Sequence, residues 1–176
     1  AHLMRSPLGF TSGPCSVAIA DEVQVELHSA DDFSEVVFVS DDCNVKTLGS
    51  SGLLVPASHN GSYYIVVRHR NSITTVSAIP VSFAGDVINY DFTDLASKAY
   101  GSNMIQMADG KWAFYAGDVN QDGSVDTGDM SPVDNDAGNY ATGYLVTDVN
   151  GDDVVDTADI TLIDNNASIF VGSATP

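Results

Sequence analysis

Apolar and polar residues alternate along much of the first half of the chain. In residues 23–29 (VQVELHS), valine and leucine alternate with polar side chains, which is the pattern of a strand with one buried face. Asn60 and Gly61 mark a turn between two such segments. About seven short strands bounded by turns predict a β-sandwich over residues 15–93. The other segments of this character are residues 35–40, 62–70, 74–83 and 85–92.

The alternation weakens in residues 94–116, which we interpret as a connecting segment packed between two modules. A turn at Asp109 and Gly110 is expected to lead into an aromatic strand containing Trp112, Phe114 and Tyr115. We expect these aromatic side chains to form a hydrophobic seam between the modules, and a glycan-stacking platform is the alternative. The absence of a Gly/Ser-rich or Pro-rich stretch here favours a rigid connection.

The last part of the chain, residues 117–176, contains one pattern twice. DVNQDGSVDTGD at Asp118–Asp129 is repeated as DVNGDDVVDTAD at Asp148–Asp159, starting 30 residues later. Each copy precedes a short apolar segment, MSPVDNDAG or ITLIDNNAS, that predicts a helix. The ninth residue of each copy can cap that helix, and the twelfth lies in its first turn, where the helix dipole favours a carboxylate.

Each twelve-residue copy has the spacing of a loop that wraps a hard cation. Oxygen-bearing side chains stand at the first, third, fifth, ninth and twelfth places, and the seventh place supplies a backbone oxygen in such loops. A sharp bend is needed at the sixth place, where Gly123 stands in the first copy and Asp153 in the second. Because aspartate tolerates positive φ less well than glycine, we expect the second site to be weaker. The predicted calcium ligands are Asp118, Asn120, Asp122, Ser124, Asp126 and Asp129, and Asp148, Asn150, Asp152, Val154, Asp156 and Asp159.

Val125 and Val155 occupy the eighth place of the two loops, where we expect an apolar side chain to point inward and pair the loops with each other.

Composition limits the classes of partner. The formal net charge is -18, with 24 acidic and 6 basic residues, and none of the basic residues lies in residues 117–176. Such a surface repels nucleic acid and anionic lipid, so we expect neither nucleic-acid binding nor membrane insertion. Residues 1–14 lack the apolar run of a signal peptide or anchor and are interpreted as a tag or a disordered N-terminus. Cys15 and Cys43 are expected either to form a disulfide or to be buried thiols.

The duplicated loop and helix, without a helix before each loop, resembles a dockerin over residues 117–171. Dockerins are calcium-binding modules that attach secreted enzymes to cohesin domains. The repeat, together with residues 63–83, is similar to C-terminal regions of secreted proteins of Bacteroidota-type bacteria. The resemblance implies a β-sandwich, Ig-like or transthyretin-like, joined to a small α-helical, EF-hand-like dockerin module with two Ca²⁺ ions. It also implies a secreted or cell-surface location and a cohesin-like or cell-surface protein as partner.

Two features depart from the dockerin pattern. The polar pair before the last ligand is Thr127 and Gly128 in the first copy, and alanine follows threonine in the second. The basic pairs expected on the helices are replaced by Asp134 with Asn135 and by an equivalent Asp–Asn pair in the second helix. The sequence therefore retains the calcium ligands but changes the residues that would recognise a cohesin.

No local motif indicates catalysis, because the repeat's carboxylates are assigned to metal and no serine–histidine–aspartate or cysteine–histidine set stands out. We therefore expect a non-catalytic attachment or assembly module pair. A carbohydrate-binding accessory module of a glycan-degrading enzyme is the alternative, and docking of the repeat onto its own sandwich is a third possibility. His69, between Arg68 and Arg70, is predicted on an exposed strand face, where this basic cluster would bind an acidic partner or hold the acidic repeat.

Overall fold

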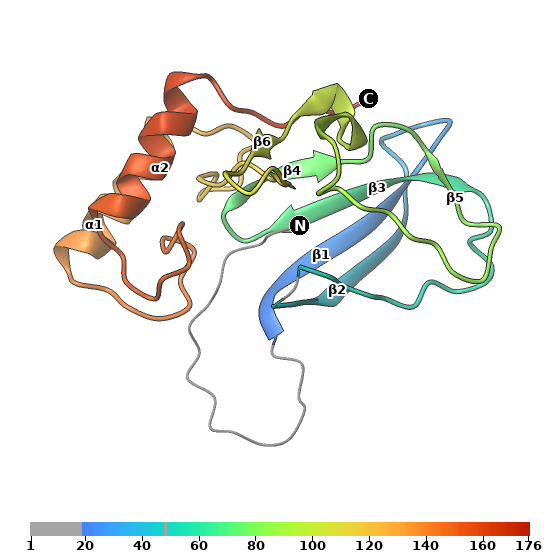
Figure 1. Ribbon diagram of the computed structural model, residues 1–176, viewed down its shortest axis with the longest axis horizontal. Helices are drawn as coiled ribbons and strands as arrows, with labels where there is room; N and C mark the ends of the chain where they lie inside the picture. Colours follow the sequence, from blue (N-terminus) through green and yellow to red (C-terminus); the bar gives the residue numbers. More distant parts are fainter. Residues whose placement is uncertain (1–18, 48) are drawn as a thin grey trace, which may run out of the picture.

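The computed structural model describes residues 19–47 and 49–176. An antiparallel β-sheet region is followed by a two-helix segment (Figure 1). Residues 1–14 and Cys15 lie outside the described residues, so the predictions made for them are not tested. Cys43 is buried, and its Sγ lies 2.9 Å from Ser51 Oγ.

Five strands form the main sheet in the order β2-β1-β3-β4, and β5 pairs with the start of β3. Every pairing is antiparallel, and Leu27 of β1 lies opposite Phe38 of β2 and Ile65 of β3. The predicted segments 23–29, 35–40 and 62–70 lie in strands, but the prediction that the polar face of residues 23–29 is exposed is wrong, because Glu26 and His28 are buried as well as Leu27. The strands are β1 (Ile19–Ser29), β2 (Val36–Lys46), β3 (Ser62–His69), β4 (Ser72–Val76) and β5 (Val81–Ser82).

The prediction of a strand at residues 85–92 is wrong. These residues form no strand, and the chain turns directly after them, because Asp91 Oδ1 accepts hydrogen bonds from both the N–H and the hydroxyl of Thr93. The predicted turn at Asp109 and Gly110 is confirmed, since it joins β6 (Ile105–Gln106) to β7 (Trp112–Ala113). Between these segments lie two 3-10 helices, η1 (Ala96–Lys98) and η2 (Tyr100–Ser102).

The first hydrophobic core lies between the main sheet and a mostly irregular second layer. Among the described residues, the regular part of this second layer is the short β6–β7 sheet, rather than the full second sheet that a sandwich prediction implies. The side chains of this core come from β1, β2 and β3 on one side and from residues 92–114 on the other. Its buried members are Val23, Val25, Cys43, Val45, Val67, Phe92, Ala99, Met104 and Phe114.

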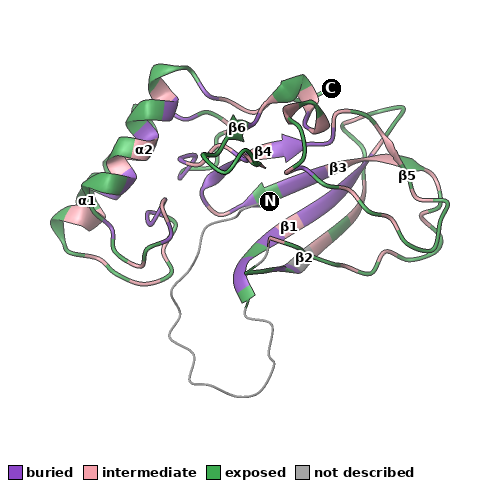
Figure 2. Ribbon diagram, viewed as in Figure 1, coloured by how far each residue is buried: buried purple, intermediate pink, exposed green. Residues whose placement is uncertain are grey.

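The second core lies within the repeat and includes one residue of the sheet. Helices α1 (Thr127–Gly138) and α2 (Thr157–Ser168) bury one face each and expose the other (Figure 2). Ile73 of β4 is fully buried in this core. The other buried members are Val119, Val125, Val133, Val149, Val155, Ile163 and Val171.

The three aromatic residues predicted as a seam divide between the two cores. Phe114 is buried in the first core and Trp112 packs against it, whereas Tyr115 packs against the second. The backbone of Tyr115 accepts a hydrogen bond from Ile73 N–H at 3.1 Å. The chain thus passes directly from one core into the other. In the described part of the chain, neither helix has the length and apolar character needed to cross a bilayer.

Candidate metal centre

The ninth and twelfth residues of each acidic loop are held at the start of the helix that follows the loop. Asp126 is the N-cap of α1 and forms a capping box with Asp129, and Asp156 and Asp159 do the same in α2. The predicted caps are therefore confirmed in both copies. A capping box satisfies backbone N–H groups that a helix start leaves unpaired, which explains why these spacings produce helices so soon after the loops.

Each loop is wound by hydrogen bonds from its own backbone to its predicted ligands. In the first copy, Gly123 N–H donates to Asp118 Oδ2 at 3.1 Å, and Asp122 N–H donates to Asn120 Oδ1 at 2.8 Å. The second copy repeats this pattern with Asp153 N–H to Asp148 Oδ2 and Asp152 N–H to Asn150 Oδ1. Such turns point side-chain oxygens toward the inside of a loop.

The twelfth residue of each loop is a buried carboxylate that accepts three backbone N–H groups. Asp129 Oδ1 accepts from Val119 N–H and Asn120 N–H at 2.7 and 3.0 Å, while Oδ2 accepts from Asp126 N–H at 2.9 Å. Asp159 makes the same three contacts thirty residues later. Both carboxylates have 0 % exposure.

The first residue of each loop distinguishes the two copies. Asp118 is buried, and its Oδ1 has no hydrogen-bond partner. Its counterpart Asp148 uses Oδ1 to accept from Gly151 N–H and Asp152 N–H at 2.8 and 3.1 Å. A buried carboxylate oxygen without a donor is costly unless a cation binds it. The first loop therefore fits a hard cation better than the second.

Electrostatics agree with this difference. Burial raises the pKa of the Asp118 carboxyl to about 6, the N–H of Gly123 opposes this rise, and the charges of Asp129 and Asp122 add to it. Burial also raises the pKa of Asp148, but N–H donors and Arg70 oppose the increase there. A divalent cation would stabilise both ionised carboxylates.

The remaining predicted ligands lie at the edge of each loop. Asp122, Asp126, Asp152 and Asp156 are exposed, as is Asn120, while Asn150 is partly buried. Within residues 19–47 and 49–176, no three histidine, cysteine or acidic side chains are grouped closely enough to form a preassembled metal site. The seventh residues form isolated β-bridges, Ser124 with Gly172 and Val154 with Thr142.

The loops do not pair with each other as predicted. Val125 N–H donates to Val171 O at 2.9 Å, and Val155 N–H donates to Ala141 O at 3.0 Å. Each loop therefore pairs with the segment that follows the helix of the other copy. This exchange explains why both valines are buried in one core, because each loop is held by the opposite half of the repeat.

Left-handed backbone occurs twice in each loop, at the fourth and sixth places. Gly123 and Asp153 have φ of 89° and 74°, as the bend at the sixth place predicted. The fourth place was missed: Gln121 has φ of 59° and Gly151 has φ of 74°. Each copy thus has one glycine and one non-glycine residue in this region. Backbone strain alone therefore gives no reason for the second site to be weaker, which corrects the argument from Asp153.

We expect Asp153→Gly to stabilise the protein by about 1 kcal/mol, because it relieves a left-handed side chain. Gln121→Gly relieves the same kind of strain but removes the hydrogen bond from Gln121 Nε2 to Asp118 O, so its gain should be smaller. Urea unfolding with chelator present measures both. Glycine at exposed Asn139, whose φ is −97°, is the control and should give no gain. No gain for Asp153→Gly would contradict the strain assigned to this position.

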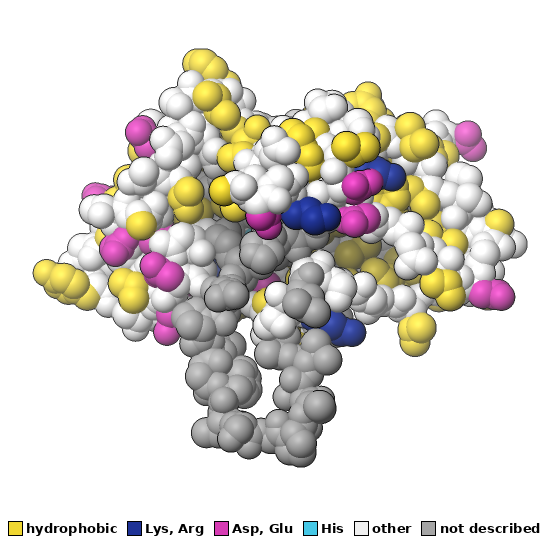
Figure 3. Space-filling model, in the orientation of Figure 1, with side chains coloured by type: hydrophobic (Ala, Val, Ile, Leu, Met, Phe, Trp, Pro, Cys, Tyr) yellow, Lys and Arg dark blue, Asp and Glu magenta, His cyan; other side chains and the backbone are white. Residues whose placement is uncertain are grey.

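No protein-family model, curated protein or solved structure matches this chain. The interpretation of the site therefore depends on its own geometry. Acidic side chains are spread over the helical part of the face in Figure 3, and Lys and Arg appear only nearer the sheet.

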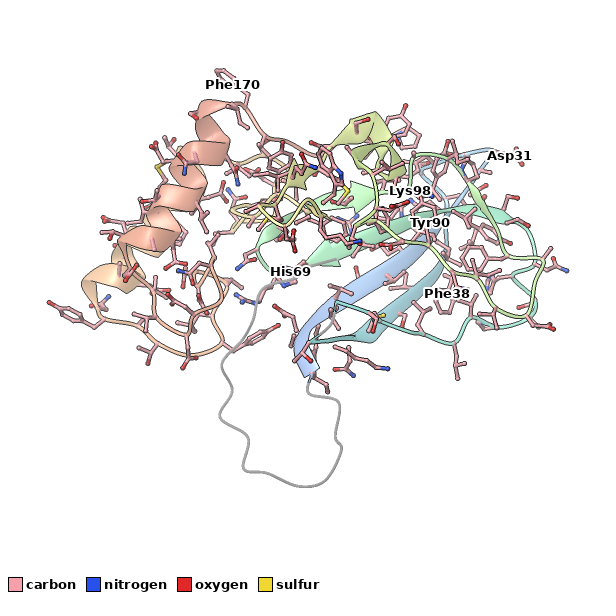
Figure 4. The ribbon with its side chains drawn as sticks, in the orientation of Figure 1. Asp31, Phe38, His69, Tyr90, Lys98 and Phe170 are labelled. Carbon is pink, nitrogen blue, oxygen red and sulfur yellow. The ribbon has the colours of Figure 1, made fainter. Side chains whose placement is uncertain are left out.

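His69 is buried, so its predicted exposure is wrong. It follows Val67 by two residues and therefore faces the same side of β3, while Arg68 between them is exposed. His69 lies at the end of the sheet nearer the helices (Figure 4), with Nε2 2.9 Å from Asp21 Oδ2. Burial raises the pKa of Asp21, but the contact with His69 and the hydroxyl of Tyr144 lower it below its ordinary value.

Proposed function

We propose that this chain is a non-catalytic attachment module in which a dockerin-like, EF-hand-like repeat binds two calcium ions and is joined rigidly to a sandwich-like sheet module. Asp118, Asn120, Asp122, Asp126 and Asp129 would hold the first ion through side-chain oxygens, with the Ser124 carbonyl. The equivalent residues of the second copy would hold the other. Calcium would supply charge neutralisation for the loops, which is stabilisation rather than catalysis.

The observation that carries this proposal is the buried Oδ1 of Asp118, which has no hydrogen-bond partner inside a loop wound by its other ligands. A solvated acidic turn would not bury its first carboxylate. The same winding in the second copy supports a second ion, with lower affinity because Asp148 Oδ1 already accepts two N–H groups.

Calorimetric titration of chelator-treated protein tests the metal directly. We expect uptake of two calcium ions per chain, with the tighter one removed by Asp118→Ala. Asp134→Ala is the matched control, because Asp134 is exposed on α1 and its loss changes the net charge equally. Absence of calcium uptake by the unmodified chain would refute the proposed function.

Calcium affinity at the first loop should decrease as the pH falls through about 6. Without metal, the pKa of folded Asp118 lies above its ordinary value of 3.8, so protons and calcium compete in this window. A pKa of about 6 implies affinity roughly tenfold weaker at pH 5 than at pH 7. The same titration at the two pH values measures it, and equal affinities would contradict the competition.

In chelator, the contribution of Asp118 to the free energy of unfolding should depend on pH in the opposite direction, decreasing as the pH rises. Because its folded pKa is raised, this contribution is fully present below pH 3.8 and is lost as the pH rises through about 6. Urea unfolding of the unmodified chain and of Asp118→Asn across this window isolates the effect. A difference that does not change with pH would contradict it.

The attachment surface proposed on the repeat is the shallow cavity of about 390 Å³ between α1 and α2. Met130 and Ile160, equivalent residues of the two copies, line it together with Thr127, Ser131 and Asp134. A cohesin-like or cell-surface protein with basic groups around an apolar contact would match this chemistry. Binding of a candidate partner should be lost on adding chelator, because the helices depend on the loops.

A glycan-binding function receives less support. Trp112, Tyr63 and Tyr64 are all partly buried rather than exposed. The ring of Tyr63 packs edge-on against His59 and Phe83, with ring centroids 6.2 and 5.8 Å away. A glycan platform needs open aromatic faces, so these contacts favour the attachment proposal.

A further inference from the structure

The turn between β3 and β4 lies between the two acidic loops. We call Arg70, Asn71 and Ser72 the hairpin tip. On the side of the first loop, Gly117 N–H donates to Asn71 O at 2.7 Å, immediately before Asp118. Ser72 forms an isolated β-bridge with Ala116. The hairpin tip therefore fixes the backbone from which the first loop starts.

The hairpin tip also holds the start of the second loop. Asn71 Nδ2 donates to Asp148 O at 2.9 Å, and Arg70 Nη1 donates to the same carbonyl at 3.0 Å and to Leu145 O. Asn71 has 0 % exposure, so these contacts exclude water. One asparagine thus contacts the first residue of one loop and the residue before the first of the other.

A second chain of contacts connects the hairpin tip with β1. The guanidinium of Arg70 lies 4.4 Å from the centre of the Tyr144 ring. Tyr144 donates its hydroxyl hydrogen to Asp21 Oδ1 at 2.5 Å, and Asp21 lies beside buried His69. The repeat is therefore attached to β1 and to the turn between β3 and β4 by polar contacts in which Asp21 and Asn71 are buried, in addition to Ile73 in its core.

We propose that the hairpin tip is a positioning element for both metal loops, so that cation binding and stability of the sheet are coupled. This inference depends on the proposed calcium function. A loop whose first residue is already fixed loses less conformational freedom on binding a cation. By reciprocity, a cation that holds Asp118 and Asp148 in place also stabilises the sheet that contacts them.

Two spectroscopic signals report separately on the sheet module and on the repeat. Trp112 is the single tryptophan of the chain and packs against the first core, whereas α1 and α2 supply the helical circular dichroism. In urea unfolding, we expect calcium to raise the midpoints of both signals together, by about 1 M. In Arg70→Met, the helical midpoint should still rise with calcium, while the rise at Trp112 falls to less than half.

Arg68→Met is the matched control. Arg68 loses the same charge, but its side chain is 44% exposed and binds Glu26 and Thr74 of the sheet rather than the repeat. Its two midpoints should move together, as in the unmodified chain. Asn71→Ala changes no charge and should separate the signals in the same way as Arg70→Met.

The outcomes distinguish this inference from the proposed function. If calorimetry records calcium uptake but the Trp112 midpoint of the unmodified chain does not move, the coupling is refuted and the calcium function stands. If calorimetry records no uptake, the calcium function itself fails. Should Arg70→Met not fold, the unmodified chain and Asn71→Ala still decide, and an Asn71→Ala variant whose signals move together overturns the assigned role.

Discussion

Replacing Asp129 by alanine should lower the free energy of unfolding by roughly 3 kcal/mol or more, even in excess chelator. The reason is the hydrogen bonding of its buried carboxylate, which accepts three backbone N–H groups and completes the capping box of α1. Alanine would leave these donors without an acceptor where water does not reach easily. Calcium would then bind weakly or not at all at the first loop, which adds a second loss when the metal is present.

Urea unfolding with and without calcium separates these two losses. Asp134→Ala, on the exposed side of the same helix, is the control and should change stability by less than about 0.5 kcal/mol. Asp159→Ala should match Asp129→Ala in chelator, because it accepts the same three N–H groups. A chelated Asp129→Ala protein as stable as the unmodified chain would show that the carboxylate acts only through a cation.

Local spacing explains why the repeat could be predicted closely from the sequence. The ninth and twelfth residues of each loop interact across three positions, so the helix starts follow from the motif itself. The alternation of β1 similarly predicts that Val23, Val25 and Leu27 are buried, but it does not predict the burial of Glu26 and His28 on the other face. The left-handed fourth residue could also have been found, because Gly151 stands in the second copy where Gln121 stands in the first.

Contacts between distant residues could not be predicted in this way. Asn71 and Asp148 lie 77 residues apart, and no local pattern connects a strand turn with an acidic loop. The second layer of the sheet module was also misjudged, because Phe92 and Phe114 complete the core from mostly irregular backbone. Burial of apolar side chains does not require a strand, so the apolar pattern of residues 85–92 was not sufficient to specify one.

Replacing Ile73 by alanine should destabilise the protein by about 3 kcal/mol, because it removes a fully buried side chain from a packed core. Ile73 belongs to β4, yet the core that it fills is that of the repeat. The cavity would therefore lie in the metal-binding part of the molecule, although the changed residue lies in the sheet. We expect both the Trp112 signal and the helical signal to unfold at lower urea concentration.

Ile79→Ala is the appropriate control, since Ile79 is 67% exposed and its truncation should have little effect. In Ile73→Ala, a decrease of the urea midpoint in the Trp112 signal alone would mean that Ile73 stabilises only its own sheet. A decrease of the urea midpoint in both signals would show that the repeat takes part of its core from the sheet. Removing the sheet would then expose apolar surface on the repeat, and changes in either part would alter calcium affinity even where they touch no ligand.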